Sequence, residues 1–564
     1  MTTECERRLK SWREDPFFDA QTRAETAALT DEAEIEDRFG SEMTFGTAGL
    51  RGLMGAGTNR MNRYTVRRAT KGLAGWLIAS EGEATARRRG VVIAFDSRFH
   101  SADFAEETAL TLCADGIPAY CFPVLTPTPV LSFAVRHLGC CAGVMITASH
   151  NPKEYNGYKV FDRDGCQLLE RQADAVLARA AAVPLTSVVP MDRAAALSAK
   201  LLRSVDPSVL DAFLDAAAAQ SHTLDSSAKR ALRVVYSPLH GAGSIPVRRI
   251  LERQGYQNVL IVPEQEKPDG AFPTVAVPNP EDREALTLGV RLAAVRDADL
   301  VIATDPDCDR VTISALHNGL YQNFTGNQLG ALLANYIFTR RADRLTSASV
   351  LVKTIVSGEL APAVARAHGV RVVEVPTGFK YIGDQIRRCE SDPELEFIMG
   401  YEESCGFLIG THALDKDAVG TCLLICEMAA YYKSQGLTLI DVLSSLYEQY
   451  GYHMSVLDTY TITGHNWKEK VRTLMAVLRL HGRELAGGPV TVLDYATGIG
   501  GLPRCDVLKF CFEDGSWMAV RPSGTEPKIK IYHSTRQKDR AAAERSIAAH
   551  RKAVLSYLAP DIPE

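Results

Sequence analysis

A loop in the first third of the chain carries a serine, a histidine and two lysines. It reads ITASHNPKEYNGYKV, residues 146–160, and it follows the apolar run AGVMI. Because such a run predicts a buried strand, we expect Ser149 and His150 to emerge at the carboxyl end of that strand, where open α/β sheets bind ligands. The turn dipeptides Asn-Pro and Asn-Gly predict that Lys153 and Lys159 lie near the serine hydroxyl. Taken alone, the loop fits a reactive site and a solvated surface turn equally well.

Three aspartates alternate in a second loop, DPDCDR, which follows the apolar run LVIA. Asp305, Asp307 and Asp309 stand at every second position, so on extended backbone their carboxylates point to one side. Oxygen-only ligands suit Mg²⁺ or Ca²⁺. An EF-hand loop would need glycine at its sixth and glutamate at its twelfth position, where this sequence has Arg310 and Leu316. We therefore predict a divalent-metal site of another kind, with a solvated acidic turn as the alternative.

Two further loops offer groups for a phosphate and for a sugar. In RPSGTEPKIK, a guanidinium, two hydroxyls and a glycine amide match the oxygens of a phosphate dianion; they belong to Arg521, Ser523, Gly524 and Thr525. In GYEESCG, the acceptors stand beside glycines and suit sugar hydroxyls; they belong to Glu402, Glu403 and Ser404. A helix-capping acidic turn is the alternative for this second loop. The segments TGFK and ALDKDA add the donors Thr377, Lys380 and Lys416.

Several glycines and arginines are interspersed between residues 45 and 63, in FGTAGLRG and GAGTNRMNR. Glycines allow backbone amides to face an anion, and Arg51 adds a charge that can bind it in bidentate fashion. A flexible glycine linker is the alternative, but linkers rarely place arginines among apolar residues in this way.

Strands and helices alternate through most of the chain, which predicts sheets with helices on their faces. We expect strands at 91–95, 119–124, 142–146, 232–237, 258–262, 300–304, 349–356, 371–375 and 396–400, and a long helix from Glu281. From about residue 454 the pattern changes to a helix near 466–480, a hairpin through 513–515, a strand at 529–533 and a final Ala- and Arg-rich helix. The predicted fold is three similar mixed α/β sheet domains followed by a smaller α+β domain, with boundaries at 1–206, 207–323, 324–453 and 454–564.

Each predicted domain has one apolar run that ends in a loop of reactive residues. AGVMI leads into TASHNP, LVIA into TDPDCDR, EFIM into GYEES, and WMAV into RPSGTEP. One such loop could arise by chance. Four of them, one in each domain, predict the walls of a single cleft.

Composition excludes several classes of protein. A hydrophobic content of 46% and a charged content of 23% are those of a folded globular protein rather than a disordered one. The net charge of −5 comes from 63 basic and 68 acidic residues that are interspersed, so we expect no nucleic-acid or membrane partner. We find no secretory signal and no apolar run long enough to span a membrane. Thirteen scattered cysteines without a Cys-x-x-Cys pair favour a reducing, cytoplasmic location over a disulfide framework or a zinc site.

All four loops, in this order and at these separations, resemble those of the α-D-phosphohexomutase superfamily, the phosphoglucomutases and phosphomannomutases. The set TASHNP, DPDCDR and RPSGTEP is highly specific, and the resemblance covers essentially the whole chain. The segments WREDPFFDAQTRAE and FGTAGLRGLMGAGTNRMN look closest to the branch that also includes phosphopentomutase and glucose-1,6-bisphosphate synthase. The resemblance implies four domains in a heart-shaped arrangement around a central cleft.

The resemblance also implies roles for individual residues. Ser149 would carry a phosphoryl group in the resting enzyme and would bind one Mg²⁺ together with Asp305, Asp307 and Asp309. Arg310 would contact the transferring phosphoryl group, Lys159 would act as general acid or base, and Arg51 and His150 would complete the phosphoserine site. Glu402 and Ser404 would bind sugar hydroxyls, and the cleft would be lined by Thr377, Gly378 and Lys416. The second phosphate would be bound by Arg521, Ser523, Gly524 and Thr525. Cys308 stands where relatives often have glycine, and we expect no effect because the backbone carries the turn.

The expected activity is a phosphoglucomutase, an isomerase that moves phosphate between C1 and C6 of glucose with glucose 1,6-bisphosphate as activator. Its partners would be small sugar phosphates, with no obligate protein partner evident. Phosphomannomutase, phosphopentomutase and bisphosphate synthase activities are alternatives within the fold. A phosphatase with an aspartyl nucleophile is an alternative from another class, because Asp305 and Asp307 also fit a D-x-D pair. A sugar-phosphate-binding protein without turnover is a third.

Overall fold

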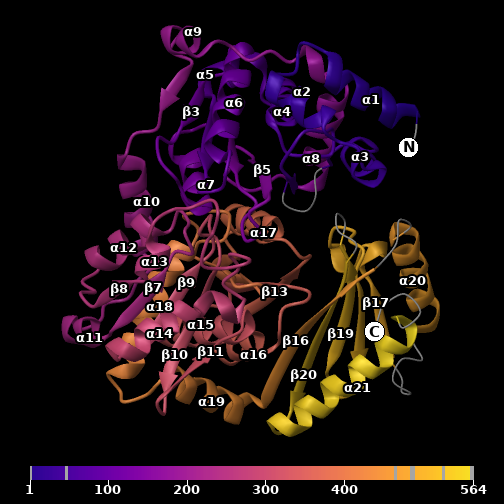
Figure 1. The fold of residues 1–564 in the computed structure, drawn as a ribbon. Helices are drawn as coiled ribbons and strands as arrows, with labels where there is room; N and C mark the ends of the chain where they lie inside the picture. The colour runs from indigo at the N-terminus through magenta and orange to yellow at the C-terminus, as the bar shows by residue number, and fades with distance from the viewer. Residues whose placement is uncertain (1–2, 45–48, 463–466, 483–489, 524–527, 559–564) are drawn as a thin grey trace.

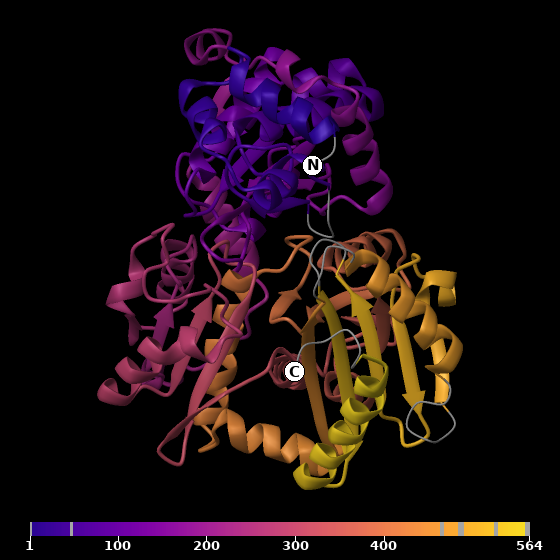
Figure 2. The ribbon, with the colours of Figure 1, turned by 45° about the vertical axis from the view of Figure 1, so that its right-hand side comes forward.

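The chain folds around four β-sheets. The first three are mixed sheets whose strands alternate with helices along the chain, and the fourth is antiparallel, which confirms the predicted fold class. The computed structural model describes residues 3–44, 49–462, 467–482, 490–523 and 528–558. We call the parts built on the successive sheets units I to IV. Unit I lies at the top of Figure 1, units II and III lie below it, and unit IV stands at the lower right; Figure 2 shows unit IV from its helical side.

Unit I is built on a six-stranded sheet in the order β1-β5-β4-β2-β3-β6, in which β5 pairs antiparallel with both β1 and β4 and the other pairs are parallel. Its helices are α1 (Thr3–Glu14), α2 (Ala20–Ala27), α3 (Glu32–Phe39), α4 (Arg63–Glu81), α5 (Glu83–Arg89), α6 (Ser101–Ala114), α7 (Thr128–His137), α8 (Glu170–Ala181), the 3-10 turn η1 (Leu185–Ser187) and α9 (Arg193–Ser198). Its strands are β1 (Leu50–Leu53), β2 (Val91–Phe95), β3 (Ala119–Cys121), β4 (Ala142–Ile146), β5 (Tyr155–Phe161) and β6 (Leu202–Ser204).

Unit II has a five-stranded sheet in the order β11-β10-β9-β7-β8, in which β10 pairs antiparallel with both β9 and β11 and the other pairs are parallel. Its strands are β7 (Val234–Ser237), β8 (Val259–Ile261), β9 (Leu300–Thr304), β10 (Val311–His317) and β11 (Leu320–Asn323). Its helices are α10 (Ser208–Ala218), α11 (Ser226–Ala231), α12 (Ser244–Arg253), α13 (Pro263–Glu266), the 3-10 turn η2 (Arg283–Leu286) and α14 (Thr287–Arg296). The prediction of a long helix from Glu281 was wrong. Asp282 caps a short 3-10 turn by accepting the amide of Glu284, and this leaves Glu281 outside the helix.

Unit III has a four-stranded sheet in the order β13-β12-β14-β15, and only β15 is antiparallel. Its strands are β12 (Ser349–Thr354), β13 (Arg371–Val375), β14 (Glu396–Glu402) and β15 (Gly406–Ile409). Its helices are α15 (Gly326–Arg340), α16 (Leu360–Ala367), α17 (Phe379–Ser391), α18 (Ala418–Lys433) and α19 (Leu439–Tyr450).

Unit IV has an antiparallel sheet in the order β16-β20-β19-β18-β17. Its elements are β16 (Tyr452–Thr461), α20 (Trp467–His481), β17 (Val490–Asp494), the 3-10 turns η4 (Tyr495–Thr497) and η5 (Ile499–Gly501), β18 (Leu508–Phe512), β19 (Trp517–Pro522), β20 (Lys528–Gln537) and α21 (Arg540–Leu558). The helix predicted near 466–480 and the hairpin predicted through 513–515 are both present.

The reactive loops occupy the same place in units I, II and III. In each unit the loop lies between a parallel strand and the antiparallel strand that follows it, in the pairs β4–β5, β9–β10 and β14–β15. The predicted turn at Asn156-Gly157 was wrong, because both residues lie inside β5 and pair with β1. This pairing places Lys159 on β5, opposite Met145, whereas Lys153 stays on the exposed loop.

One cluster of buried apolar side chains runs through units I, II and III. It includes Met145 of β4, Phe213 of α10, Tyr236 of β7 and Tyr401 of β14, all with no exposed surface. Their shared core fixes the positions of the three loops relative to one another.

Unit IV has a core of its own, formed by side chains such as Leu478 of α20 and Phe510 of β18. A smaller cluster joins it to unit III and contains Ile355, Val356, Tyr495, Val507, Trp517, Ala519 and Tyr532. At this junction the ammonium of Lys509 donates a hydrogen bond to the Ile355 carbonyl at 2.8 Å and lies 4.2 Å from the centre of the Trp517 ring. Among the described residues, no helix combines the length and the apolar character needed to cross a bilayer.

Because unit IV has a separate core, we predict that the protein unfolds in two calorimetric transitions. Leu478→Ala should lower the transition temperature of unit IV only, and Phe213→Ala that of units I to III only. In each case the cavity created should reduce the free energy of unfolding of the affected part by about 3 kcal/mol. Differential scanning calorimetry of the two variants measures this. A single transition that both variants lower equally would contradict it.

Candidate active site

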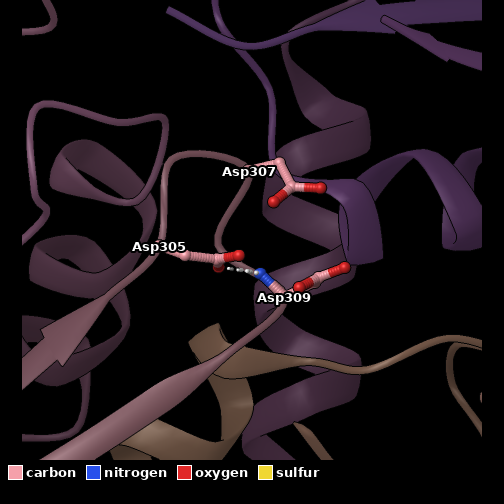
Figure 3. A group of neighbouring side chains, drawn as sticks. All are labelled: Asp305, Asp307 and Asp309. Atoms are coloured by element: carbon pink, nitrogen blue, oxygen red, sulfur yellow. Dashed lines mark hydrogen bonds between the residues drawn. The ribbon is translucent and has the colours of Figure 1, made fainter. Parts of the chain in front are cut away.

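The three aspartates converge at the tip of the β9–β10 loop. One carboxylate oxygen from each of Asp305, Asp307 and Asp309 lies within 4.8 Å of the others, and the three residues have at most 1% exposed surface (Figure 3). The loop is a tight turn rather than the extended backbone we expected. Asp305 accepts the amide of Asp309 at 3.0 Å, and Cys308 adopts a left-handed backbone with φ of 53°. Cys308 thus takes a conformation that glycine would adopt more readily.

The donor set fits a hard divalent cation. The Oδ1 atoms of Asp307 and Asp309 are buried and have no hydrogen-bond partner, which is costly for carboxylates unless an ion binds there. Burial and the charges of Asp309 and Asp307 raise the pKa of Asp305 well above its usual value. A cation that stabilises the ionised carboxylates would remove this penalty. Asp305, Asp307 and Asp309 are therefore the residues that would hold a metal ion.

Two buried lysines from other units compensate part of this charge. The ammonium of Lys159 lies 2.7 Å from Asp307 and 3.3 Å from Asp309, and that of Lys416 lies 3.3 Å from Asp309. Burial disfavours the charged form of both lysines, but the neighbouring carboxylates outweigh it and raise both pKa values. Burial would also raise the pKa of Asp309, yet the surrounding cations hold it below its usual value.

Ser149 lies directly against the aspartate loop. Its hydroxyl donates a hydrogen bond to Asp305 at 2.7 Å, and its Oγ lies 3.1 Å from His150 Nδ1. Ser149 is 5% exposed and has φ of 53°. The prediction that Ser149 and His150 follow the carboxyl end of a buried strand, β4, is confirmed.

The two residues expected beside the serine differ in exposure, since His150 is half-buried and Arg51 is exposed. Burial and the charges of Arg310 and Arg51 lower the pKa of His150 well below its usual value. Arg51 on β1 is exposed, and its guanidinium donates a hydrogen bond to the Asn151 side chain at 3.1 Å. Arg51 thus contacts the serine loop from the solvent side.

Arg310 is held by an acidic residue that the sequence did not single out. Its Nη1 donates to Glu281 at 2.8 Å, whereas its buried Nε has no partner and lies 4.0 Å from Asp309 Oδ1. Thr128 was also missed. Its amide and hydroxyl bind the Asp307 carbonyl at 2.9 Å and the Asp307 carboxylate at 2.8 Å.

In unit III, the charges of Lys416 and Arg310 act on the buried carboxylate of Glu402. Glu402 accepts the Gly378 amide at 2.9 Å, and burial raises the pKa of Glu402. The Thr377 hydroxyl oxygen is buried without a partner. Ser404 lines a cavity of about 210 Å³ between units II, III and IV.

Two other predicted groups of unit III turn elsewhere. Glu403 accepts hydrogen bonds from Thr354 and Ser357 within unit III. Lys380 pairs with Glu170 of unit I at 2.7 Å, so it holds two units together rather than facing the aspartates.

Unit IV contributes cations. Arg521 on β19 pairs in register with Lys530 on β20, and the Ser523 amide donates to the Lys528 carbonyl at 2.8 Å. Burial and the charges of Arg521 and Arg310 lower the pKa of Lys530. Gly524 and Thr525 lie outside the described residues.

Four family models match consecutive parts of the chain. They are described as phosphoglucomutase/phosphomannomutase alpha/beta/alpha domain I at residues 42–185, domain II at 211–318, domain III at 325–450 and C-terminal domain at 472–550. The chain belongs to the phosphoglucomutase/phosphomannomutase family.

Similar proteins extend along almost the whole chain. A phosphoglucomutase of Staphylococcus haemolyticus is 35% identical over 532 residues, which cover 92% of this chain and 93% of the relative. A phosphoglucomutase of Staphylococcus aureus strain USA300 is 36% identical over 521 residues, 89% of this chain and 92% of the relative.

Solved structures share the fold at lower identity. The open form of parafusin, a phosphoglucomutase from Paramecium, has a TM-score of 0.70 at 17% identity and covers 93% of this chain and 97% of its own. A family protein from Burkholderia thailandensis has a TM-score of 0.69 at 18% identity and covers 93% and 100%. These likenesses support the four-domain fold of the family.

If the aspartate loop binds a metal, Asp307→Asn should weaken the binding of Mn²⁺ or Mg²⁺ by at least about tenfold, because one charged ligand is lost. Isothermal titration calorimetry with the metal alone measures this. Asp299→Asn, at the opposite end of β9, is the matched control and should bind like the wild type. Equal affinity of Asp307→Asn and wild type would refute the site.

Proposed function

We propose that the protein is a phosphoglucomutase that interconverts α-D-glucose 1-phosphate and glucose 6-phosphate through a phosphoserine at Ser149 and a glucose 1,6-bisphosphate intermediate. The observation that carries this proposal is the 2.7 Å hydrogen bond from the Ser149 hydroxyl to Asp305, within a buried group of three carboxylates. A serine that exchanges a phosphoryl group must lie beside charges that neutralise that group.

We propose that Asp305, Asp307 and Asp309, together with the serine oxygen, bind one Mg²⁺. Bound there, the ion would neutralise negative charge on the transferring group. A solved N-acetylphosphoglucosamine mutase of Aspergillus fumigatus, with a TM-score of 0.51 and 14% identity, is described in complex with GlcNAc-6P and magnesium.

The residues of this chain would divide the remaining work. Arg310 now donates a hydrogen bond to Glu281 and would exchange this partner for the phosphoryl group. Its buried Nε, which has no hydrogen-bond partner, is available to bind the same group. Lys159 would act in the half-reaction in which the phosphoryl group moves from the sugar to Ser149, because despite burial the neighbouring carboxylates raise its pKa. The bond from phosphorus to the sugar oxygen would break as the bond to the Ser149 oxygen forms. Lys159 would give a proton to the sugar oxygen, and the proton of the Ser149 hydroxyl would pass to Asp305, which accepts its hydrogen bond. His150 and Arg51 would complete the phosphoserine site.

The opposite side of the site would bind the sugar and its second phosphate. We assign the sugar hydroxyls to Glu402 and Ser404, and the wall of the cleft to Thr377, Gly378 and Lys416. We assign the second phosphate to Arg521, Ser523, Gly524 and Thr525. The bisphosphate must turn end over end between two half-reactions, so one phosphate site has to lie on each side of the sugar.

The choice of glucose rests on the relatives. Those named above at 35–36% identity are phosphoglucomutases, and activity on mannose or pentose phosphates and bisphosphate synthesis are the alternatives. Coupled assays with glucose, mannose and ribose 1-phosphates, each with a trace of glucose 1,6-bisphosphate, should give the highest rate for glucose. Equal rates on ribose and glucose would overturn the sugar but not the mechanism.

The domain boundaries at 206, 323 and 453 and the cytoplasmic location stay predictions.

The aspartyl phosphatase is less favoured than the mutase, because Asp305 already accepts the Ser149 hydroxyl and lies beside Asp309 rather than facing solvent.

Ser149→Ala should lower the mutase rate at least about a thousandfold, because the group that carries the phosphoryl is lost. Glucose 6-phosphate formation in a coupled assay measures the rate, and peptide mapping by mass spectrometry should find phosphate on Ser149 of the wild type. Ser97→Ala, which removes a nearby hydroxyl without a hydrogen-bond partner, should keep full activity. An active Ser149→Ala enzyme together with an inactive Asp305→Asn enzyme would favour the phosphatase instead.

A further inference from the structure

Ser149 needs unusual backbone support. Its φ of 53° is a left-handed conformation that residues with a side chain rarely adopt. The conformation matters for function, because it directs the hydroxyl towards Asp305. Some other part of the protein must therefore hold the peptide groups on both sides of Ser149.

Arg98 holds the carbonyl side. Its side chain has no exposed surface, and its guanidinium donates hydrogen bonds to the carbonyls of Ser149 at 2.6 Å, Pro152 at 2.8 Å and Tyr155 at 3.1 Å. It also donates to the carbonyl of Asn151. One side chain thus binds four carbonyls of the serine loop and determines its path.

Asp96 holds the amide side through Thr147. The Ser149 amide donates to the Thr147 hydroxyl oxygen at 2.8 Å, and that hydroxyl donates to Asp96 at 2.6 Å. Asp96 also lies 3.3 Å from Arg98. Both peptide groups of Ser149 are therefore tied to a single buried ion pair.

Unit II covers this ion pair. The Phe272 ring lies over the Arg98 guanidinium at 5.0 Å from ring centre to guanidinium carbon. At Gly270 the two backbones pass so closely that an added Cβ would lie 2.6 Å from the Phe99 amide nitrogen. The cover excludes water from a network whose hydrogen bonds are stronger when dry, and it belongs to the unit that carries the aspartate loop.

We propose that Arg98, supported by Asp96 and Thr147, is a positioning residue for phosphoryl transfer. It fixes Ser149 in its left-handed conformation and sets the position of the serine loop relative to the aspartate loop. The inference rests on the proposed function. It adds a residue that does not touch the sugar phosphate but determines where the accepting oxygen stands. Displacement of a reacting atom by about 1 Å can lower a rate about a hundredfold.

The test compares Arg98→Lys with Arg60→Lys. Lysine keeps the charge but cannot bind four carbonyls at once. Arg60 is the matched control. It is another buried arginine of unit I, 6% exposed, which binds the Asn59 carbonyl and Asp37 away from the serine loop. Three quantities are measured in each variant: the folded fraction by circular dichroism, kcat and KM for glucose 1-phosphate, and the phosphate on Ser149 after incubation with glucose 1,6-bisphosphate.

We expect kcat per folded molecule to fall about a hundredfold in Arg98→Lys, with KM within about twofold of the wild type and slower phosphorylation of Ser149. Arg60→Lys should lose stability only. Unchanged kcat per folded molecule in Arg98→Lys would overturn the inference, because Arg98 would then be purely structural. So would a change confined to KM.

A second variant keeps the inference testable if Arg98→Lys fails to fold. Thr147→Val preserves the shape of the side chain but removes the hydroxyl that joins Asp96 to the Ser149 amide. It should lower kcat about tenfold or more with KM unchanged, and full activity would refute the network. An inactive wild type would instead refute the proposed function, and this outcome is distinct from an active wild type with equally active variants.

Discussion

The structure depends on placing three carboxylates in a closed space. Like charges repel strongly where water is excluded, and each buried carboxylate loses its hydration. Asp305, Asp307 and Asp309 are nevertheless almost fully buried, and their cationic partners come from separate parts of the chain. Lys159 comes from unit I and Lys416 from unit III. The aspartate loop is thus compatible with the folded state only when three units are docked around it.

The distribution of the core follows from this constraint. Units I to III share one continuous apolar cluster, so the serine, the aspartates and the two lysines are held as a rigid group. Backbone hydrogen bonds to unit III reinforce the group, because the Val311 amide of β10 donates to the Cys405 carbonyl and the Ala418 amide donates to the Cys308 carbonyl of the aspartate loop. Unit IV has its own core and a smaller junction with unit III. A unit attached in this way can move as a body without disturbing the aspartates, which suits a site that must admit a sugar phosphate and then exclude water.

Much of the site was predictable because the reactive residues follow apolar strands. Ser149 and the three aspartates are close in space for that reason, although Asp305 lies 156 positions after Ser149 in the sequence. The residues that the sequence did not reveal act through contacts between distant segments. Thr128 binds Asp307 across 179 positions, and no local pattern indicates this.

The backbone conformation of two segments was also not predictable from the sequence. Alternation of the aspartates suggested extended backbone, whereas the left-handed conformation of Cys308 closes the loop into a turn. Asn156-Gly157 had the composition of a turn, but pairing with β1 placed it inside a strand. In both cases the tertiary structure outweighed the local preference.

The most direct test of the account is a crystal structure of the protein grown with Mn²⁺, with the ion located by its anomalous scattering. The account predicts one strong anomalous peak, at a position where the ion binds carboxylate oxygens of Asp305, Asp307 and Asp309 and lies next to the Ser149 oxygen. Lys159 should remain beside the ion. A saturating concentration of Mn²⁺ that leaves these carboxylates paired only with Lys159 and Lys416, or that places the ion elsewhere, would contradict it.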